Sequence, residues 1–334
     1  MVFWLFSGCL LIFLMVVIGG ITRLTRSGLS IVEWNVIMGT LPPLNEHQWQ
    51  EMFDKYKQYP EYQKLNYHFS LHDFKNIFWW EYIHRLLARV IGLVFIIPFV
   101  FFWMKGKISK RLMPRLIFIF LLGAFQGFLG WYMVKSGLVD DPYVSHYRLA
   151  IHLIAAFLTF GAIFWVALDE LYGYKKIVSV NKKLLRLSWV FLVVLTIQII
   201  YGAFVAGLKA GYIFTTWPKM GDAWIAEAVT YMRPFYINFL EGLAGVQFVH
   251  RYIAYLLIIL AGVIWFYSNK YSLSKAQNTG VNLLVLTTLV QVVLGIFTLV
   301  YRVPISLGVI HQAGAFFLFT FNLFLIHRLR GSEL

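Results

Sequence analysis

Long apolar stretches alternate with shorter polar segments along the whole chain. The apolar stretches cover residues 2–21, 78–103, 112–134, 147–168, 187–207, 243–267, 281–300 and 306–327. Each is close to the length of about 20 residues that a helix needs to cross the hydrocarbon core of a bilayer. The pattern predicts an all-α polytopic membrane protein with eight transmembrane helices.

Composition supports this prediction. Of the 334 residues, 60% are hydrophobic and only 13% are charged, which is too apolar for a single water-soluble core. The first stretch has no basic segment before it and no small-residue cleavage site, so we interpret it as a helix and not as a signal peptide. The chain also begins without a transit peptide, which favours a bacterial inner membrane over an organelle.

The net charge of +14 could indicate nucleic-acid binding, but the placement of the basic residues indicates membrane topology instead. They crowd alternate connections: Lys105, Lys107, Lys110, Arg111 and Arg115; Lys175, Lys176, Lys182, Lys183 and Arg186; Lys270 and Lys275; and Arg328 and Arg330 at the end of the chain. Basic residues concentrate on the cytoplasmic side of a membrane. We therefore expect both termini in the cytoplasm and the long loop 22–77 outside.

Two segments of the first half recur in the second half. Glu81-Tyr-Ile-His84-Arg85 is matched by Gln247-Phe-Val-His250-Arg251, and Ile151-His152-Leu-Ile-Ala-Ala-Phe157 is matched by Ile310-His311-Gln-Ala-Gly-Ala-Phe316. Gly19 is matched by Gly202, and Gln126-x-x-x-Gly130 by Gln291-x-x-x-Gly295. The duplication predicts two tandem four-helix bundles, 1–170 and 187–334, joined by a basic cytoplasmic linker over 171–186. Each unit has an even number of spans, so a pseudo-twofold axis near the membrane normal should relate them.

The duplicated histidines are the strongest candidates for function. Imidazole is costly inside a membrane, so His84, His152, His250 and His311 need a purpose there. All four lie near the outer ends of even-numbered spans, on the order of 6 to 12 Å below the outer boundary. Two facing pairs at one depth predict axial ligation of two hemes, side by side near the outer surface.

Other interpretations stay open for single residues. One intramembrane histidine can be a hydrogen-bonded helix contact, and a zinc or di-iron site would recruit more carboxylates or cysteines than Glu81 alone. Arg85 and Arg251 suit heme propionates but would equally snorkel to lipid headgroups. Gln126 and Gln291 would pack between helices or orient a ligand. The remaining histidines are expected to face solvent: His47, His68, His72, His146 and His327.

The two halves differ at one decisive position. Glu81 precedes His84 by one helical turn, whereas Gln247 stands at the matching place before His250. A buried carboxylate beside a heme can exchange protons during a reaction. We therefore assign the reaction to the first half, and a structural or electron-transfer role to the second. The alternative for Glu81 is a salt bridge to Arg85, four residues later.

Longer motifs carry a family resemblance over essentially the whole chain. These are Gly-Gly-Ile-Thr22-Arg23-Leu-Thr25-Arg26-Ser-Gly28-Leu-Ser30, Phe74-Lys-Asn-Ile-Phe-Trp-Trp-Glu81-Tyr-Ile-His84-Arg85, Trp217-Pro-Lys-Met220-Gly221-Asp222 and Phe248-Val-His250-Arg251. With them the chain resembles the heme A synthase family of mitochondria and many Gram-negative bacteria. The resemblance implies an oxidoreductase that converts a peripheral methyl group of heme O to the formyl group of heme A for cytochrome oxidase. Ligation by two imidazoles leaves no open iron position for oxygen, so water is the expected oxygen source.

The resemblance also implies roles for individual residues and partners. His84 and His152 would hold the iron of the substrate heme, His250 and His311 would hold a resident heme b, and Glu81 would be required for turnover. The farnesyltransferase that makes heme O and cytochrome oxidase assembly factors become candidate partners beside the membrane lipid, and a homo-oligomer stays open.

The chain departs from other family members in its cysteines. They carry a cysteine pair in the first external loop, whereas Cys9, in the first span, is the only cysteine here. No internal disulfide can form, so thiol chemistry in that loop is not expected. Two other functions fit paired heme ligands: a diheme cytochrome b-like electron-transfer protein and a heme carrier. Ligands spread one per helix disfavour the former, and the Glu81 and Gln247 difference is unexplained by the latter.

Overall fold

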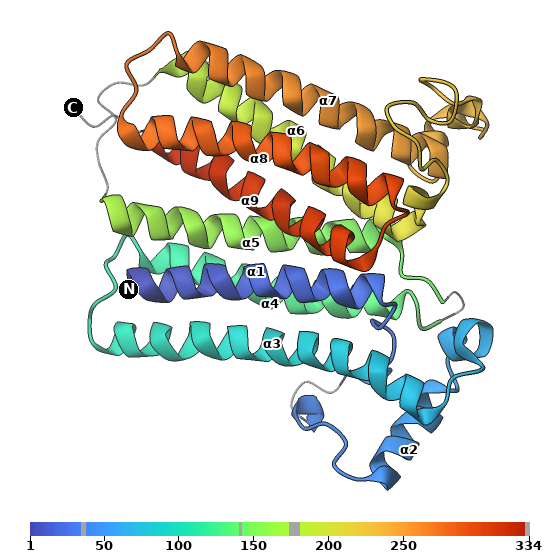
Figure 1. Cartoon of the computed structure of the whole chain (residues 1–334). Helices are drawn as coiled ribbons and strands as arrows, with labels where there is room; N and C mark the ends of the chain where they lie inside the picture. The colour runs from blue at the N-terminus through green and yellow to red at the C-terminus, as the bar shows by residue number, and fades with distance from the viewer. Residues whose placement is uncertain (35–37, 140–141, 174–180, 331–334) are drawn as a thin grey trace. The chain divides into compact units, whose positions relative to one another are not determined.

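The computed structural model describes residues 1–34, 38–139, 142–173 and 181–330 (Figure 1). Over these residues the protein is helical and contains no β-strand. Eight helices are long and apolar enough to cross a membrane, as predicted. They are α1 (Val2–Leu24), α3 (Leu71–Met104), α4 (Met113–Lys135), α5 (His146–Tyr172), α6 (Lys182–Leu208), α7 (Leu243–Ser268), α8 (Lys275–Val300) and α9 (Ile305–Arg330).

Two of these helices begin well before their predicted starts because polar caps, and not hydropathy, set their first residues. The Ser70 side chain accepts a hydrogen bond from the Asp73 backbone, and the Asp73 carboxylate accepts one from the Ser70 backbone, so α3 begins at Leu71. Ser274 and Gln277 form the same capping box at the start of α8. The apolar pattern therefore detected only the part of each helix that suits hydrocarbon.

The described chain divides into two compact units. One contains Met1–Phe6 and residues from Phe160 onward. Within it α6, α7, α8 and α9 lie side by side as a four-helix bundle, in which α6 packs on α7 and α9, and α8 packs on the same two helices (Figure 1). Phe191, Ile264, Leu284 and Leu325 are buried in this unit.

The other unit contains Ser7–Thr159 and carries an additional helix, α2 (Glu46–Tyr56). The Asn45 side chain caps this helix by accepting a hydrogen bond from the Gln48 backbone. Its apolar face packs on the start of α3 in one aromatic cluster. We call this cluster the loop core; it comprises Trp49, Phe53, Tyr56, Phe74, Ile77, Phe78 and Tyr82.

Short helices occupy the connections. They are η1 (Met38–Thr40), η2 (Tyr62–Asn66), η3 (Ala210–Tyr212), η4 (Glu227–Thr230) and η5 (Phe235–Phe239). The predicted linker 171–186 falls partly outside the described residues, including its Lys175 and Lys176. The predicted division into 1–170 and 187–334 therefore stays a prediction.

Two histidines expected to face solvent are buried, so that expectation was wrong for them. His146 is only 8% exposed at the start of α5. His327 lies inside α9, which continues to Arg330, and its Nε2 is 3.1 Å from Asp169 Oδ1 of α5. Helices that continue past the apolar stretch have buried these imidazoles.

Candidate functional site

Each of the two predicted ligands in the first half lies against a glycine of another helix. A Cβ placed on Gly19 of α1 would lie 3.3 Å from Nε2 of His84 on α3. A Cβ placed on Gly130 of α4 would lie 3.4 Å from Cε1 of His152 on α5. The glycines thus leave room for two rings inside one unit.

The same arrangement occurs in the second half. A Cβ on Gly202 of α6 would lie 3.4 Å from Cε1 of His250 on α7, and a Cβ on Gly295 of α8 would lie 2.9 Å from Cε1 of His311 on α9. The ring centres of His250 and His311 are 6.5 Å apart, with the ring planes at 77°. Each unit therefore contains two of the four predicted ligands, and each imidazole lies against a glycine of another helix.

This geometry fits an iron held between two imidazoles. A ring nitrogen lies about 2 Å from a bound transition metal and about 1 Å from its own ring centre, so two rings on opposite sides of one metal have centres about 6 Å apart. The Nδ1 atoms of His152, His250 and His311 are also buried without a hydrogen-bond partner. Two imidazoles supply only the axial positions, so a porphyrin would have to supply the others.

A bare metal ion fits less well. Nowhere in the described part of the chain do three or more His, Cys, Asp or Glu side chains gather where they could hold a metal. Structural metal sites ordinarily need more protein ligands than a pair. Cys9, which is free and buried in α1, adds no ligand to either histidine pair.

Glutamine side chains attach two of the ligand helices, α5 and α9, to their neighbours. Gln126 Nε2 donates to the backbone oxygen of His152 over 3.1 Å, and Gln291 Nε2 donates to that of His311 over 2.8 Å. These amides bridge helices at the ligand residue itself, which combines the two roles considered for them. They fix the backbone from which each imidazole projects.

One further glutamine beside a candidate ligand was not predicted from the sequence. Gln198 Nε2 lies 3.5 Å from Nε2 of His250, which makes it the neighbour of a candidate ligand nitrogen. Gln198 precedes Gly202 by four residues, so Gln-x-x-x-Gly occurs a third time. That spacing would have identified Gln198, because residues four apart share one helix face.

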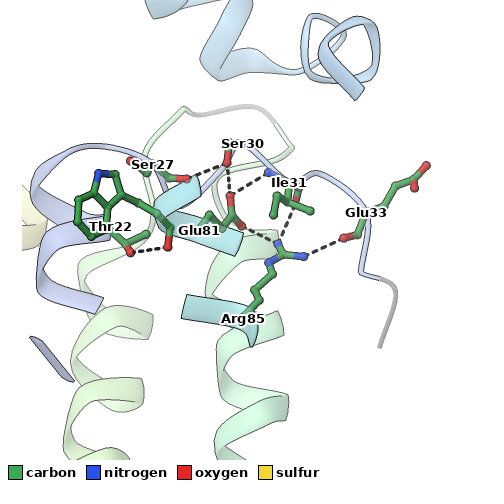
Figure 2. A network of polar contacts seen from close by, with 8 residues as sticks. Thr22, Ser27, Ser30, Ile31, Glu33, Glu81 and Arg85 are labelled. Carbon is green, nitrogen blue, oxygen red and sulfur yellow. Dashed lines mark hydrogen bonds and ion pairs between the residues drawn. The ribbon is translucent and has the colours of Figure 1, made fainter. Parts of the chain in front are cut away.

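Glu81 is the centre of a buried polar network in the first half (Figure 2). Its side chain is only 3% exposed. Oε2 accepts hydrogen bonds from Ser30 Oγ at 2.7 Å and from the Ile31 backbone N–H at 2.8 Å. Oε1 accepts one from Nη2 of Arg85 at 2.7 Å. The carboxylate thus forms the ion pair that was the alternative interpretation, and it holds the segment after α1 against α3.

Arg85 extends this network along the same segment. Its guanidinium donates to the backbone oxygen of Ile31 at 2.7 Å and to that of Glu33 at 2.8 Å (Figure 2). It also stacks over the ring of Trp34, 4.7 Å from the ring centre. Two carbonyls, one carboxylate and one indole already surround Arg85, so a propionate would have to share or displace these contacts.

Arg251 is held by the same kind of contacts in the second half. Its guanidinium donates to the backbone oxygens of Phe214, Thr216 and Lys219 at 2.7, 2.8 and 3.2 Å. Gln247 Nε2 donates to Phe214 over 3.0 Å. The two frameworks match except at the position of the acid: Glu81 accepts hydrogen bonds, whereas Gln247 donates one. Only the first half places an ionisable group there.

The chain is similar to known proteins over almost its whole length. Residues 2–323 match the model of a family described as cytochrome oxidase assembly protein. Curated relatives named heme A synthase are 49% identical in Flavobacterium johnsoniae, over 98% of this chain and 97% of the relative, and 49% identical in Nitrosospira multiformis, over 98% and 92%. One from Parvibaculum lavamentivorans is 47% identical over 98% of this chain and 93% of its own length.

Proposed function

The chain belongs to the family of cytochrome oxidase assembly proteins that includes the curated heme A synthases, and on that premise we propose that it oxidises a methyl group of heme O to the formyl group of heme A. A relationship to enzymes named for heme A follows from the comparisons. The particular reaction is our proposal. The observation that supports this proposal is the arrangement of four histidines as two pairs, in which each imidazole lies against a glycine.

We assign the first pair to the substrate and the second to a resident cofactor. His84 and His152 would hold the heme O iron, because Glu81 occurs in that half alone. His250 and His311 would hold heme b, and their ring separation of 6.5 Å supports ligation of one iron by both. When bound there, heme b would supply one-electron redox chemistry.

The chemistry requires a proton acceptor near the methyl group. Converting a methyl to a formyl group with one oxygen atom from water releases four protons and four electrons, and an electron acceptor outside this chain would have to take up the electrons. Glu81 is buried, and its Oε1 lies 2.7 Å from Nη2 of Arg85, so a carboxyl group that can exchange protons is held in a fixed position there. Ser30 and the Ile31 backbone hold the other carboxylate oxygen in place. Glu81 would therefore accept protons during turnover, with Arg85 and Ser30 positioning it.

The membrane location follows from the same proposal. Eight apolar helices support a multi-pass protein of a bacterial inner membrane. Basic residues at alternate connections support cytoplasmic termini and histidine pairs toward the outer side. In that orientation the substrate would arrive from the farnesyltransferase that makes heme O, and the product would leave toward cytochrome oxidase assembly factors.

Pigment analysis tests the proposed reaction. The full chain is expressed in cells that make heme O but lack any other heme A synthase, and the extracted hemes are identified by mass. We expect heme A or a hydroxylated heme O, with heme b beside it. Heme b alone would contradict the proposed reaction and leave an electron-transfer protein or a heme carrier. Cells carrying the empty vector control for background heme A.

A further inference from the structure

The hydroxyl group of Ser30 lies between two acceptors in the polar network around Glu81 (Figure 2). Ser30 Oγ is 2.7 Å from Glu81 Oε2 and 3.1 Å from the backbone oxygen of Ser27. Ser30 is only 1% exposed, and Ser27 is fully buried. A serine hydroxyl carries one hydrogen and two lone pairs, so it donates to one of these two oxygens at a time. The hydrogen of Ser30 therefore has two alternative positions.

The other groups that hold the Glu81 carboxylate can only donate. Arg85 Nη2 donates to Oε1 at 2.7 Å, and the Ile31 backbone N–H donates to Oε2 at 2.8 Å. A guanidinium group and a backbone N–H have no lone pair that could accept a hydrogen bond. Among the described residues that hydrogen-bond to Glu81, Ser30 is therefore the only one that can also accept a hydrogen bond.

This property of Ser30 matters when Glu81 carries a proton. The O–H group of a buried carboxylic acid needs an acceptor, because an unpartnered buried donor is costly. Oε1 faces the Arg85 cation, which disfavours a proton there and leaves Oε2 as the better place for it. A proton on Oε2 has an acceptor in Ser30 Oγ if Ser30 turns its own hydrogen to the backbone oxygen of Ser27.

The second half lacks both the acid and this hydroxyl. The backbone oxygens of Ile31 and Phe214 occupy equivalent places, since each accepts a hydrogen bond of 2.7 Å from the arginine of its half. The residue before them is Ser30 in the first half and Ile213 in the second. The acid is replaced there too, by Gln247. The hydroxyl is thus present only in the half to which we assign the reaction.

We propose that the hydroxyl of Ser30 reverses its hydrogen bond to Glu81 when Glu81 takes up a proton during turnover. With Glu81 ionised, Ser30 donates to Oε2; with Oε2 protonated, Ser30 accepts from it and donates to Ser27. The inference rests on the proposed function, in which oxidation of the methyl group releases the proton. Only hydrogen bonds exchange at Ser30, whose own O–H bond stays intact. Ser30 acts through Glu81 and is therefore a positioning residue and not a catalytic residue.

Substitutions of Ser30 test this reversal through the kinetics of heme O oxidation by the full-length protein in membrane vesicles. Ser30→Ala removes the acceptor but leaves the Arg85 and Ile31 donors in place, so it selectively destabilises protonated Glu81. We expect kcat to fall about tenfold or more, while KM and the heme b content stay at wild-type values. Ser30→Thr keeps the hydroxyl and should recover most of the rate.

Ser188→Ala is the matched control for the loss of a buried serine hydroxyl. Ser188 is fully buried, and its hydroxyl donates to the backbone oxygen of Leu184 within α6 at 2.9 Å. This variant should keep the wild-type rate. A Ser30→Ala variant with the wild-type kcat, or with a loss of rate matched by a loss of heme b, would overturn the proposal. So would a Ser30→Thr variant that binds heme b normally but is as slow as Ser30→Ala.

A double-mutant cycle separates this role from a general support of the loop. In Glu81→Gln the carboxyl group that takes up the proton is gone, so adding Ser30→Ala should change the residual rate little. Single-turnover reactions with enzyme in excess, in which the products are identified by mass, measure this slow rate. An equal fold loss from Ser30→Ala in both backgrounds would show a structural role and overturn the proposal. A wild type that forms no oxidised heme would overturn the proposed function first, which is a distinguishable result.

Discussion

At the scale of single residues, the proposed heme sites depend on four positions that have no side chain beyond hydrogen. Four glycines leave space for the four imidazoles. A Cβ added at any of these glycines would lie 3.4 Å or less from the neighbouring imidazole ring. Contacts below about 3.4 Å force a neighbour to shift in a close-packed interior. An added Cβ would therefore displace the ring at Gly295 and, to a smaller extent, at Gly19, whereas at Gly130 and Gly202 it would lie at the limit of ordinary contact.

Gly295→Ala tests this requirement where the space is smallest. The added Cβ would lie 2.9 Å from Cε1 of His311, so the ring must move away from Gly295 and change its geometry relative to His250. We expect heme b binding to weaken about tenfold or more, as for other changes that misorient a ligand. Heme content per chain after purification measures it. Gly262→Ala on α7 is the control, since its Cβ would meet nothing within 4 Å; equal heme content in the two variants would refute the requirement.

Glu81→Gln tests the reaction without removing a ligand. The amide keeps the size of the side chain but loses the ability to accept protons and the ion pair with Arg85. We expect turnover of heme O to fall about 100-fold or more while both hemes remain bound. Rates and absorption spectra are measured on the same preparation, with Glu46→Gln as an exposed control. Unchanged production of heme A would remove Glu81 from the chemistry.

At the scale of elements, α2 and the loop core attach the first external loop to α3. Trp49 packs edge-on against Phe78 with ring centres 4.8 Å apart, and Phe53 stacks on Phe74 at 5.2 Å. Aromatic pairs of this kind add to the stabilisation that comes from burying their area. The segment that provides Ser30 and Ile31 to Glu81 belongs to the same unit, so the loop core is expected to stabilise the site from outside the membrane.

Trp49→Ala should detach α2 from α3. Removing a buried indole from an aromatic cluster typically costs about 3–5 kcal/mol, here acting on local opening of the loop. Limited proteolysis should cut the loop faster in this variant, with heme b content unchanged. Leu44→Ala, at a side chain 73% exposed, is the control and should be cut at the wild-type rate. Resistance of Trp49→Ala equal to that of the control would contradict the assigned role of α2.

The stability of this loop should also depend on pH through Glu61. Burial raises the pKa of Glu61 from 4.5 to about 8 in the folded loop. Since the folded state binds the proton more tightly, the contribution is fully present below pH 4.5 and is lost as the pH rises through about 8. Proteolysis should therefore accelerate across that range in the wild type and Glu46→Gln, and depend less on pH in Glu61→Gln. The same pH dependence in all three proteins would exclude Glu61 as its source.

At the scale of the whole molecule, the sequence predicted the helices well and the contacts between them poorly. Eight spans follow from hydropathy, because hydrocarbon selects apolar helices of a fixed length. The early starts of α3 and α8 depend on polar caps that hydropathy ignores. The duplication indicated the four histidines. Their contacts with glycines of other helices, and the contact of Gln198 with His250, depend on helix packing. Likewise, three of the four neighbours of Arg85, which are Ile31, Glu33 and Trp34, are present only because the chain after α1 folds back onto α3.

The central claim is that each half holds one heme between two histidines. The most direct test is the heme content and identity of four purified full-length proteins: the wild type, His84→Ala, His311→Ala and the control His47→Ala, which alters a histidine of the external loop. We expect two hemes per chain in the wild type and the control, loss of heme O or its products in His84→Ala, and loss of heme b in His311→Ala. Colourless wild-type protein, or ligand variants with the wild-type heme content, would contradict the account.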